Sequence, residues 1–230
     1  KNYNKVLFQN QDDLNLFLNL SIIKKENLKS IIPSSGVEIS NFDHNKSVYP
    51  DNITFGLASR MIINKGISEF CSAAKNIKKK FPHVRFMIVG DFDKSIYSLQ
   101  YKKTIDLFKE AEIDYRGWED NISDFYRKIS IYVLPSYREG TPRSVLEAMA
   151  SSRPIITTNV PGCKETVINN KNGFLIKEKN VDQLEETMKN FINDENLIRK
   201  MGKESLNIAC EKFNVEIINK KLLEEINNVI

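Results

Sequence analysis

The chain has 230 residues, of which 41% are hydrophobic and 28% charged, as is ordinary for a globular protein. This length fits one large domain or two small ones, and the composition excludes a disordered chain. The formal net charge of +4 is small and the cations are scattered among acids, so we expect no nucleic-acid partner.

The three cysteines, Cys71, Cys163 and Cys210, are far apart and form no CxxC pair. This usage is typical of a reducing compartment and predicts neither a disulfide framework nor a zinc site. No apolar run approaches the roughly 20 residues of a membrane span, and no signal peptide is visible. We therefore expect a cytoplasmic protein, with peripheral contact at the inner face of the membrane left open.

Strand-like and helix-like segments alternate along the chain. The first segments are predicted strands at residues 6–9 and 29–32, a helix at 12–19 and a linker or crossover at 33–50. A clearer series follows, with strands at residues 53–58, 84–89, 114–116, 130–134, 154–157 and 173–176. Helices are predicted at residues 66–80, 98–111, 122–128, 143–150, 162–168, 181–193, 195–211 and 215–229. This order favours an α/β fold, a doubly wound parallel sheet with helices on both faces.

In such a sheet the ligand lies beyond the carboxyl ends of the strands, so the loops that follow strands matter most. The loop after residue 58 carries two cations, Arg60 and Lys65. A lysine at a helix N-terminus opposes the helix dipole, and binding a diphosphate would explain its presence. Two surface cations would be the better interpretation if this pair stood alone.

The loop after residue 134 carries the most informative pattern. Glu139 lies in the loop, and Glu147 lies eight positions later inside a predicted helix. Thr141 is a candidate N-cap and Pro142 suits the first helical position. The amides of residues 143–145 would then be free and, with the helix dipole, would form an anion site.

The two glutamates have three possible interpretations at this point. They could act as general acid and base on a glycosidic bond, bind a metal, or form ion pairs with Arg138 or Arg143. Gly90, after another strand, permits close approach of a ligand or of neighbouring backbone. The loop at residues 116–122 holds the only tryptophan, whose ring could contact a base or be a core or rim aromatic.

Together, these motifs closely resemble the family 4 retaining glycosyltransferases. The resemblance rests on Arg60, Lys65-Gly66, the glutamates of the stretch EGTPRSVLEAMA, the PII of residues 154–156 and the GFL of residues 173–175. It covers roughly residues 50–229. The stretches YREGTPR and VPGC look like those of bacterial capsule, lipopolysaccharide and protein-glycan enzymes that use UDP-sugars.

The resemblance implies a GT-B fold, in which two Rossmann-like domains face a cleft, with no catalytic metal and no cofactor beyond the nucleotide-sugar substrate. It implies transfer of a hexose or N-acetylhexosamine, from a UDP-sugar to a glycan or lipid-linked acceptor, with retention of configuration. By the same resemblance, Arg60 and Lys65 stabilise the leaving diphosphate. Glu139 contacts the donor sugar near the reacting carbon, and Glu147 binds the ribose hydroxyls.

Backbone groups complete the implied donor site. Amides of residues 144 and 145 would touch the diphosphate or ribose, and those of Gly140, Thr141 and the neighbours of Pro142 would approach sugar hydroxyls. The backbone of residues 116–118 would read the uracil, with Trp118 or Ile122 against the ring. The implied donor-binding set is Arg60, Lys65, Gly90, Arg116, Gly117, Trp118, Ile122, Glu139, Gly140, Thr141, Pro142, Arg143, Ser144, Val145 and Glu147.

The sequence departs from the family pattern in two respects. Residues 91–93 read Asp-Phe-Asp where a second glycine often follows Gly90. A whole family member is usually much longer, with an N-terminal domain that supplies the acceptor site. We therefore expect residues 1–50 to be the remnant of that domain plus a linker, residues 51–212 the donor-binding domain, and residues 213–230 a helix that packs back toward the missing domain.

This expected division implies that the chain alone is inactive without its acceptor domain. The alternative is a non-catalytic module that binds a nucleotide sugar, or the partner subunit of a split glycosyltransferase. The two intact glutamates favour the enzyme, because a module without chemistry has no need of both.

Overall fold

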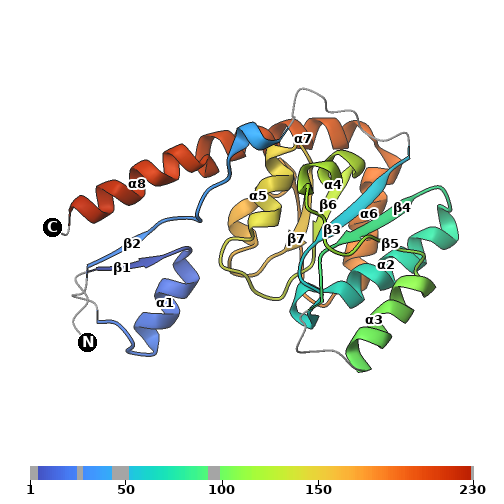
Figure 1. Cartoon of the computed structure of the whole chain (residues 1–230), viewed down its shortest axis with the longest axis horizontal. Helices are drawn as coiled ribbons and strands as arrows, with labels where there is room; N and C mark the ends of the chain where they lie inside the picture. Colours follow the sequence, from blue (N-terminus) through green and yellow to red (C-terminus); the bar gives the residue numbers. More distant parts are fainter. Residues whose placement is uncertain (1–4, 25–27, 43–51, 93–98, 229–230) are drawn as a thin grey trace.

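The structure, a computed structural model, describes residues 5–24, 28–42, 52–92 and 99–228. Near the N-terminus, β1 (Lys5–Phe8) and β2 (Leu28–Ile31) pair in parallel and are connected through α1 (Gln11–Asn19). The other strands form one six-stranded sheet with the order β5-β4-β3-β6-β7-β8 (Figure 1). The chain thus contains a small sheet and a large one.

The large sheet consists of β3 (Thr54–Ala58), β4 (Arg85–Val89), β5 (Asp114–Tyr115), β6 (Ile131–Leu134), β7 (Ile155–Thr158) and β8 (Gly173–Ile176). Every neighbouring pair of these strands runs parallel. The helices are α2 (Ile67–Lys80), α3 (Leu99–Glu110), α4 (Ile122–Lys128), α5 (Arg143–Ala150), α6 (Val181–Asn193), α7 (Asn196–Ile208) and α8 (Val215–Asn227). The predicted α/β fold is confirmed.

Helices cover both faces of the large sheet because its strands are apolar on both sides. Successive strand residues point to opposite faces. On β3, Phe55 and Leu57 join a buried cluster with Phe70 of α2, whereas Ala58 joins a second cluster with Leu146 of α5. This burial explains why the strands appear in the sequence as continuous apolar runs rather than alternating ones.

The strand order places the topological switch point between β3 and β6. From β3 the chain proceeds outward to β4 and β5, and then returns to pair β6 with the other side of β3. Ligands of doubly wound sheets bind at such a point, beyond the carboxyl ends of the strands. The loops after β3 and β6 hold the predicted cations and Glu139, so the topology brings these residues together.

The helix predicted at residues 162–168 is wrong, because only a single 3-10 turn forms there, Lys164–Thr166. The side chain of Asn172 forms hydrogen bonds with the backbone groups that a helix would have paired. Its Oδ1 accepts from the Ile168 amide at 2.8 Å, and its Nδ2 donates to the Thr166 carbonyl at 3.1 Å. The helix predicted at residues 195–211 ends at Ile208 and continues as a π-helical stretch, Ala209–Phe213.

The small sheet contacts the rest of the molecule through α8, which extends over it from the large domain (Figure 1). Glu225 of α8 forms an ion pair with Lys5 of β1 and accepts from Ser30 Oγ of β2 at 2.8 Å. The division at residues 1–50, 51–212 and 213–230 stays a prediction. Residues 43–50 of the predicted linker, residue 93 and the predicted helix ends at residues 98 and 229 lie outside the described residues.

Candidate active site

The loop after β3 presents Arg60 and Lys65 at the switch point. Residues Ile63–Lys65 form a 3-10 turn, so Lys65 lies before the N-cap of α2 rather than within its first turn. The N-cap is Gly66, with φ at 69°, and a Cβ there would lie 2.2 Å from the Pro135 carbonyl oxygen. Glycine is therefore required where the β3 loop passes the end of β6.

The loop after β6 is tied directly to the β3 loop. The Asn64 carbonyl accepts from the Tyr137 amide at 2.9 Å, and Ser136 Oγ lies 2.9 Å from the same carbonyl oxygen. On its other side, the Glu139 amide donates to the Pro161 carbonyl at 3.1 Å. These bonds hold the Glu139 segment between two neighbouring loops, so its carboxylate has a defined place.

Glu139 and Lys65 form an ion pair that is largely withdrawn from water. Lys65 Nζ lies 2.5 Å from Glu139 Oε1, and the two side chains are only 17% and 12% exposed. Ser136 Oγ donates to the same carboxylate oxygen at 2.6 Å. The possible pairing of Glu139 with Arg138 does not form, since Arg138 pairs with Asp13 of α1 instead. Removing either partner of so enclosed a pair would leave the other charge without compensation.

Glu147, on α5, is held by two different donors. Its Oε1 accepts from Arg143 Nε at 3.0 Å, and its Oε2 accepts from the Tyr126 hydroxyl at 3.1 Å. The same hydroxyl lies 2.9 Å from the Ser144 carbonyl. Burial of Tyr126 raises its pKa well above the usual value, so it stays protonated and able to donate. The predicted pairing of Glu147 with Arg143 is thus present.

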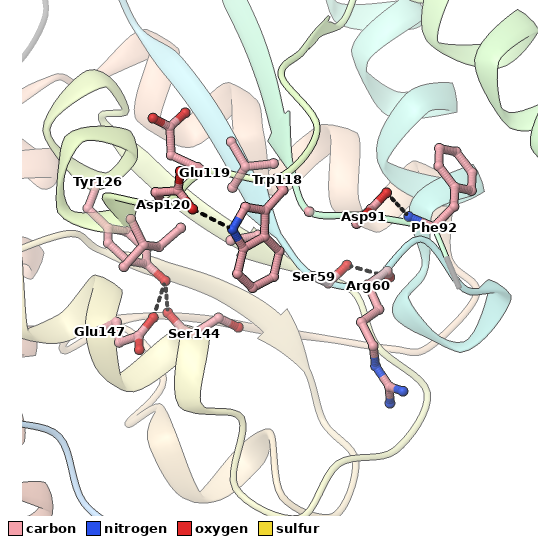
Figure 2. A pocket seen from close by; sticks show the side chains of 14 residues that line it. Ser59, Arg60, Asp91, Phe92, Trp118, Glu119, Asp120, Tyr126, Ser144 and Glu147 are labelled. Carbon is pink, nitrogen blue, oxygen red and sulfur yellow. Dashed lines mark hydrogen bonds between the residues drawn. The ribbon is translucent and has the colours of Figure 1, made fainter. Parts of the chain in front are cut away.

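Two cavities adjoin at Arg60, which lines both. The larger has a volume of about 520 Å³ and includes six of the predicted donor residues: Arg60, Gly90, Trp118, Ile122, Ser144 and Glu147. Figure 2 shows Trp118, Arg60 and Glu147 around it, with Tyr126 directed toward Glu147. We call it the nucleoside-side cavity.

The smaller cavity, of about 410 Å³, is far richer in charge. It includes Arg60, Lys65, Glu139 and Gly140 from the predicted set, and also Asp13 and Arg138. We call it the sugar-side cavity. The two glutamates, although only eight residues apart, therefore lie in different cavities.

The remaining predicted residues line neither cavity. They are Arg116, Gly117, Thr141, Pro142, Arg143 and Val145. The Arg116 amide donates to the Ile88 carbonyl at 3.0 Å, and the Gly117 carbonyl accepts from the Gly90 amide at 2.7 Å. These backbone groups extend the sheet edge, and their predicted contact with a base remains untested.

The structure narrows the interpretations of Gly90 and Trp118, although their predicted contacts with a donor stay predictions. A Cβ on Gly90, whose φ is 128°, would lie 1.8 Å from the Ser59 carbonyl oxygen, so this glycine admits neighbouring backbone. Trp118 is 72% exposed, and its Nε1 donates to Asp120 Oδ1 at 2.9 Å. The interpretation of Trp118 as a core aromatic is therefore wrong, because the ring lies at the rim of the nucleoside-side cavity.

The predicted bounds of α5, residues 143–150, are confirmed, but the predicted N-cap is wrong by one residue. Pro142, with φ at −70° and ψ at 111°, is the N-cap, and α5 begins at Arg143. The Val145 amide donates to the Pro142 carbonyl at 3.0 Å, so it is not free to bind an anion as expected. Thr141 does not act as the cap, because its Oγ1 is buried and makes no hydrogen bond within the described residues, while its amide donates to Gln9 Oε1 at 2.9 Å.

Sequence reasoning missed three residues of the site, Gln9, Asp13 and Tyr126. The first two come from the small sheet and its helix, where the sequence showed no loop chemistry. Tyr126 lies on α4 within an otherwise apolar face, and nothing in its spacing indicated contact with Glu147. Only the packing of α4 against α5 brings the two together.

Within residues 5–24, 28–42, 52–92 and 99–228, no group of three or more His, Cys, Asp or Glu side chains is placed to hold a metal ion. Over the same ranges, none of the helices combines the length and the apolar character needed to cross a bilayer.

A family model described as "Glycosyl transferases group 1" matches residues 39–207. The chain belongs to this family. It is 30% identical to the capsular polysaccharide biosynthesis glycosyltransferase CapM of Staphylococcus aureus, over 88% of this chain and 56% of that protein. It is 28% identical to the N,N'-diacetylbacillosaminyl-diphospho-undecaprenol alpha-1,3-N-acetylgalactosaminyltransferase of Campylobacter jejuni, over 97% of this chain and 60% of that enzyme. The chain thus spans little more than half the length of these relatives.

Solved structures agree on the fold. The Anabaena protein Alr3699/HepE, in complex with UDP and glucose, superposes with a TM-score of 0.85 at 19% identity, covering 97% of this chain and 63% of that one. The C-terminal domain of the group 1 glycosyl transferase LpcC from Francisella tularensis gives a TM-score of 0.68 at 26% identity, covering 78% of this chain and 99% of that domain. The fold is that of GT-B glycosyltransferases, and the match with LpcC is to a C-terminal domain.

Proposed function

We propose that this chain is the donor-binding portion of a retaining glycosyltransferase. In this proposal it transfers a hexose or N-acetylhexosamine from a UDP-sugar to a glycan or lipid-linked glycan acceptor. The observation that carries the proposal is the position of Arg60 between a nucleoside-side cavity and a charged sugar-side cavity, at the switch point of the sheet. A nucleotide sugar has the same division, with its diphosphate in the middle.

The two cations would stabilise the leaving group. As the bond between the anomeric carbon and the β-phosphate oxygen breaks, negative charge grows on the diphosphate, next to Arg60 and Lys65. The acceptor hydroxyl bonds to the same face of that carbon, and its proton passes to the departing phosphate oxygen. Charges already in place at such a position need little reorganisation, and this is the basis of a large catalytic effect.

Glu139 would have two tasks in this scheme. Without a donor it compensates Lys65, at 2.5 Å, and keeps the ammonium in place beside the sugar-side cavity. With a donor bound, its carboxylate faces the sugar near the reacting carbon. Glu147 would accept hydrogen bonds from the ribose hydroxyls in the nucleoside-side cavity.

The acceptor class is inferred from relatives. The Campylobacter jejuni relative and the UDP-Gal:alpha-D-GlcNAc-diphosphoundecaprenol alpha-1,3-galactosyltransferase of Escherichia coli, 30% identical over 83% of this chain and 49% of that enzyme, are both named for diphosphoundecaprenol-linked sugars. A lipid-linked acceptor would place the working enzyme at a membrane surface, and we propose peripheral contact there.

Isothermal titration with UDP tests the proposal. We expect UDP to bind, with affinity at least about tenfold weaker in Arg60→Ala and in Lys65→Ala, since each removes a charged hydrogen-bond donor. Lys75→Ala is the matched control, because Lys75 lies on the exposed surface of α2, where it pairs with Glu110 of α3. Binding should be the same with EDTA present. Absence of UDP binding, or equal binding by all three variants, would overturn the donor-site assignment.

A further inference from the structure

One side chain at the end of the small sheet contacts the loop between β6 and α5, which carries Glu139. Gln9 directly follows β1, and its Oε1 accepts from the Thr141 amide at 2.9 Å. Thr141 lies between β6 and α5 of the large sheet, far along the chain. The contact therefore connects the carboxyl end of a strand in the small sheet with the loop that carries Glu139.

Gly140 leaves the space that Gln9 occupies. A Cβ at residue 140 would lie 2.2 Å from Gln9 Oε1 and 3.3 Å from Gln9 Cδ, and it would meet no other neighbour within 4 Å. Gly140 does not have a positive φ, so its backbone would accept an alanine without strain. Gln9 is thus the neighbour that occupies the space which a side chain at residue 140 would need.

The turn that carries Gln9 is itself firmly built. Asn10, only 1% exposed, is the N-cap of α1, and its Oδ1 accepts from the Asp13 amide at 2.8 Å. Its Nδ2 donates to Asp13 Oδ2 at 2.9 Å. Gln9 is therefore presented from a rigid strand end rather than from a loose loop.

Two ion pairs also join the first turn of α1 to the loops that follow β6 and β7. Asp13 pairs with Arg138, and Asp12 Oδ2 lies 2.8 Å from Lys164 Nζ. Exposed ion pairs stabilise weakly and are screened by salt, so they do not define orientation well. The hydrogen bond of Gln9 and its fit against Gly140 fix the orientation of the β1 end relative to the loop after β6.

Resting on the proposed function, we propose that Gln9 is a positioning residue for the donor sugar. Its carboxamide, which lines neither cavity itself, holds the peptide between Gly140 and Thr141 from the side of the small sheet. A donor sugar would then enter a loop already set in place by the small sheet. The nucleoside-side cavity does not include Gln9, so binding of UDP itself should not depend on it.

The contact is tested first in the free chain, by the nitrogen-15 NMR signal of the Thr141 amide and its hydrogen exchange. Gln9→Ala and Gly140→Ala should each shift this signal and speed its exchange by about fivefold, the effect of one lost hydrogen bond. The double variant should be no different from either single one, because both changes remove the same contact. Gln11→Ala is the matched control, since Gln11 donates to Asn15 within α1, on the exposed surface.

The functional consequence is tested by titration with UDP, UDP-glucose and UDP-N-acetylglucosamine. In Gln9→Ala the affinity for UDP should stay within about twofold, while the additional affinity for the preferred UDP-sugar should fall about fivefold. Gln9→Met, which keeps the side-chain length without an amide acceptor, should behave as Gln9→Ala.

The outcomes separate the two proposals. If the wild-type chain binds no nucleotide, the proposed function fails, and a Thr141 signal that does not move with Gln9 would also end the inference. If UDP-sugars bind and Gln9→Ala leaves their affinity unchanged, the inference is overturned and the donor site stands. Additive effects of Gln9→Ala and Gly140→Ala would likewise overturn it, because Gly140 would then act independently of Gln9.

Discussion

The two cavities on either side of Arg60 differ in how they are built. The sugar-side cavity is lined by opposite charges that neutralise one another at short range, above all the Lys65–Glu139 pair. The nucleoside-side cavity combines apolar and aromatic groups with four carboxylates, those of Asp91, Glu119, Asp120 and Glu147. Of these, Glu147 is fixed by the neutral hydroxyl of Tyr126 and by Arg143. Paired opposite charges mark one side, and apolar surface around the anchored Glu147 marks the other.

This difference indicates how the work is divided. Charges that compensate each other without a ligand can be redistributed when a diphosphate arrives, so the sugar-side cavity suits chemistry in which charge moves. A carboxylate held by a buried tyrosine keeps one orientation, so the nucleoside-side cavity suits recognition. Changes to Glu139, which faces the sugar, should therefore affect turnover, and changes to Glu147 should affect affinity. Changes to Arg60 and Lys65, which would contact the diphosphate, should affect both.

The largest effect is expected for Glu139→Gln. The amide keeps the shape and the contact with Ser136 but removes the charge that faces Lys65, so turnover should fall by about 100-fold or more. UDP affinity should remain within about twofold, since Glu139 would face the sugar, which UDP lacks, rather than the diphosphate. Turnover is measured with the protein expressed from its complete gene, and UDP affinity by titration.

Glu110→Gln serves as the control, because Glu110 lies on the exposed surface of α3 and pairs only with Lys75. If Glu139→Gln weakened UDP binding as strongly as it lowered turnover, the two cavities would not divide the work as we infer.

Glu147→Gln should show the opposite pattern. Losing a charged acceptor for the ribose hydroxyls should weaken UDP binding by about tenfold or more, whereas turnover at saturating donor should change little. The measurement is titration with UDP beside a rate at saturating UDP-sugar. A loss of turnover with unchanged affinity would mean that the carboxylate acts in the chemical step instead.

Tyr126→Phe should produce a smaller and more specific change. The phenylalanine fills the same buried space, so the fold is kept, but Glu147 loses the hydroxyl that orients it. We expect UDP affinity to fall about threefold, one modest hydrogen bond. The preference for UDP over 2'-deoxy-UDP should shrink as well, because a loosely held carboxylate contacts the ribose hydroxyl less well.

Titrating both nucleotides against both proteins forms a double-mutant cycle that isolates this coupling. Equal losses for UDP and 2'-deoxy-UDP would show that Tyr126 acts on packing alone.

The fold was largely predictable from the sequence because its signals are local. The apolar runs of β6 and β8 and the periodicity of α4, α5 and α6 each depend on neighbouring residues, and the observed bounds follow them closely. The segment at residues 162–168 failed because Asn172, outside the segment, takes its backbone hydrogen bonds. A local pattern contains no information about such a competitor.

The candidate site was predictable where the residues follow strands of one sheet. Arg60, Lys65 and Glu139 meet because the strand order places their loops at one edge, and the alternation of elements already indicated that edge. Gln9 and Tyr126 reach the site from a second sheet and from a helix face. Their contacts depend on three-dimensional packing over large sequence separations, which no spacing rule describes.

The smallest effect is expected for Trp118→Ala. The indole is 72% exposed and its loss leaves no cavity in the core, so thermal stability should stay within about 1 °C, while UDP affinity falls about threefold through lost ring contact. Trp118→Phe should restore most of that affinity. Because Trp118 is the only tryptophan, its fluorescence reports on the nucleoside-side cavity alone, and UDP should change the emission of the wild-type chain. Unchanged fluorescence at saturating UDP would mean that the base lies away from Trp118. Recognition of the nucleoside would then depend on Glu147 and not on the indole.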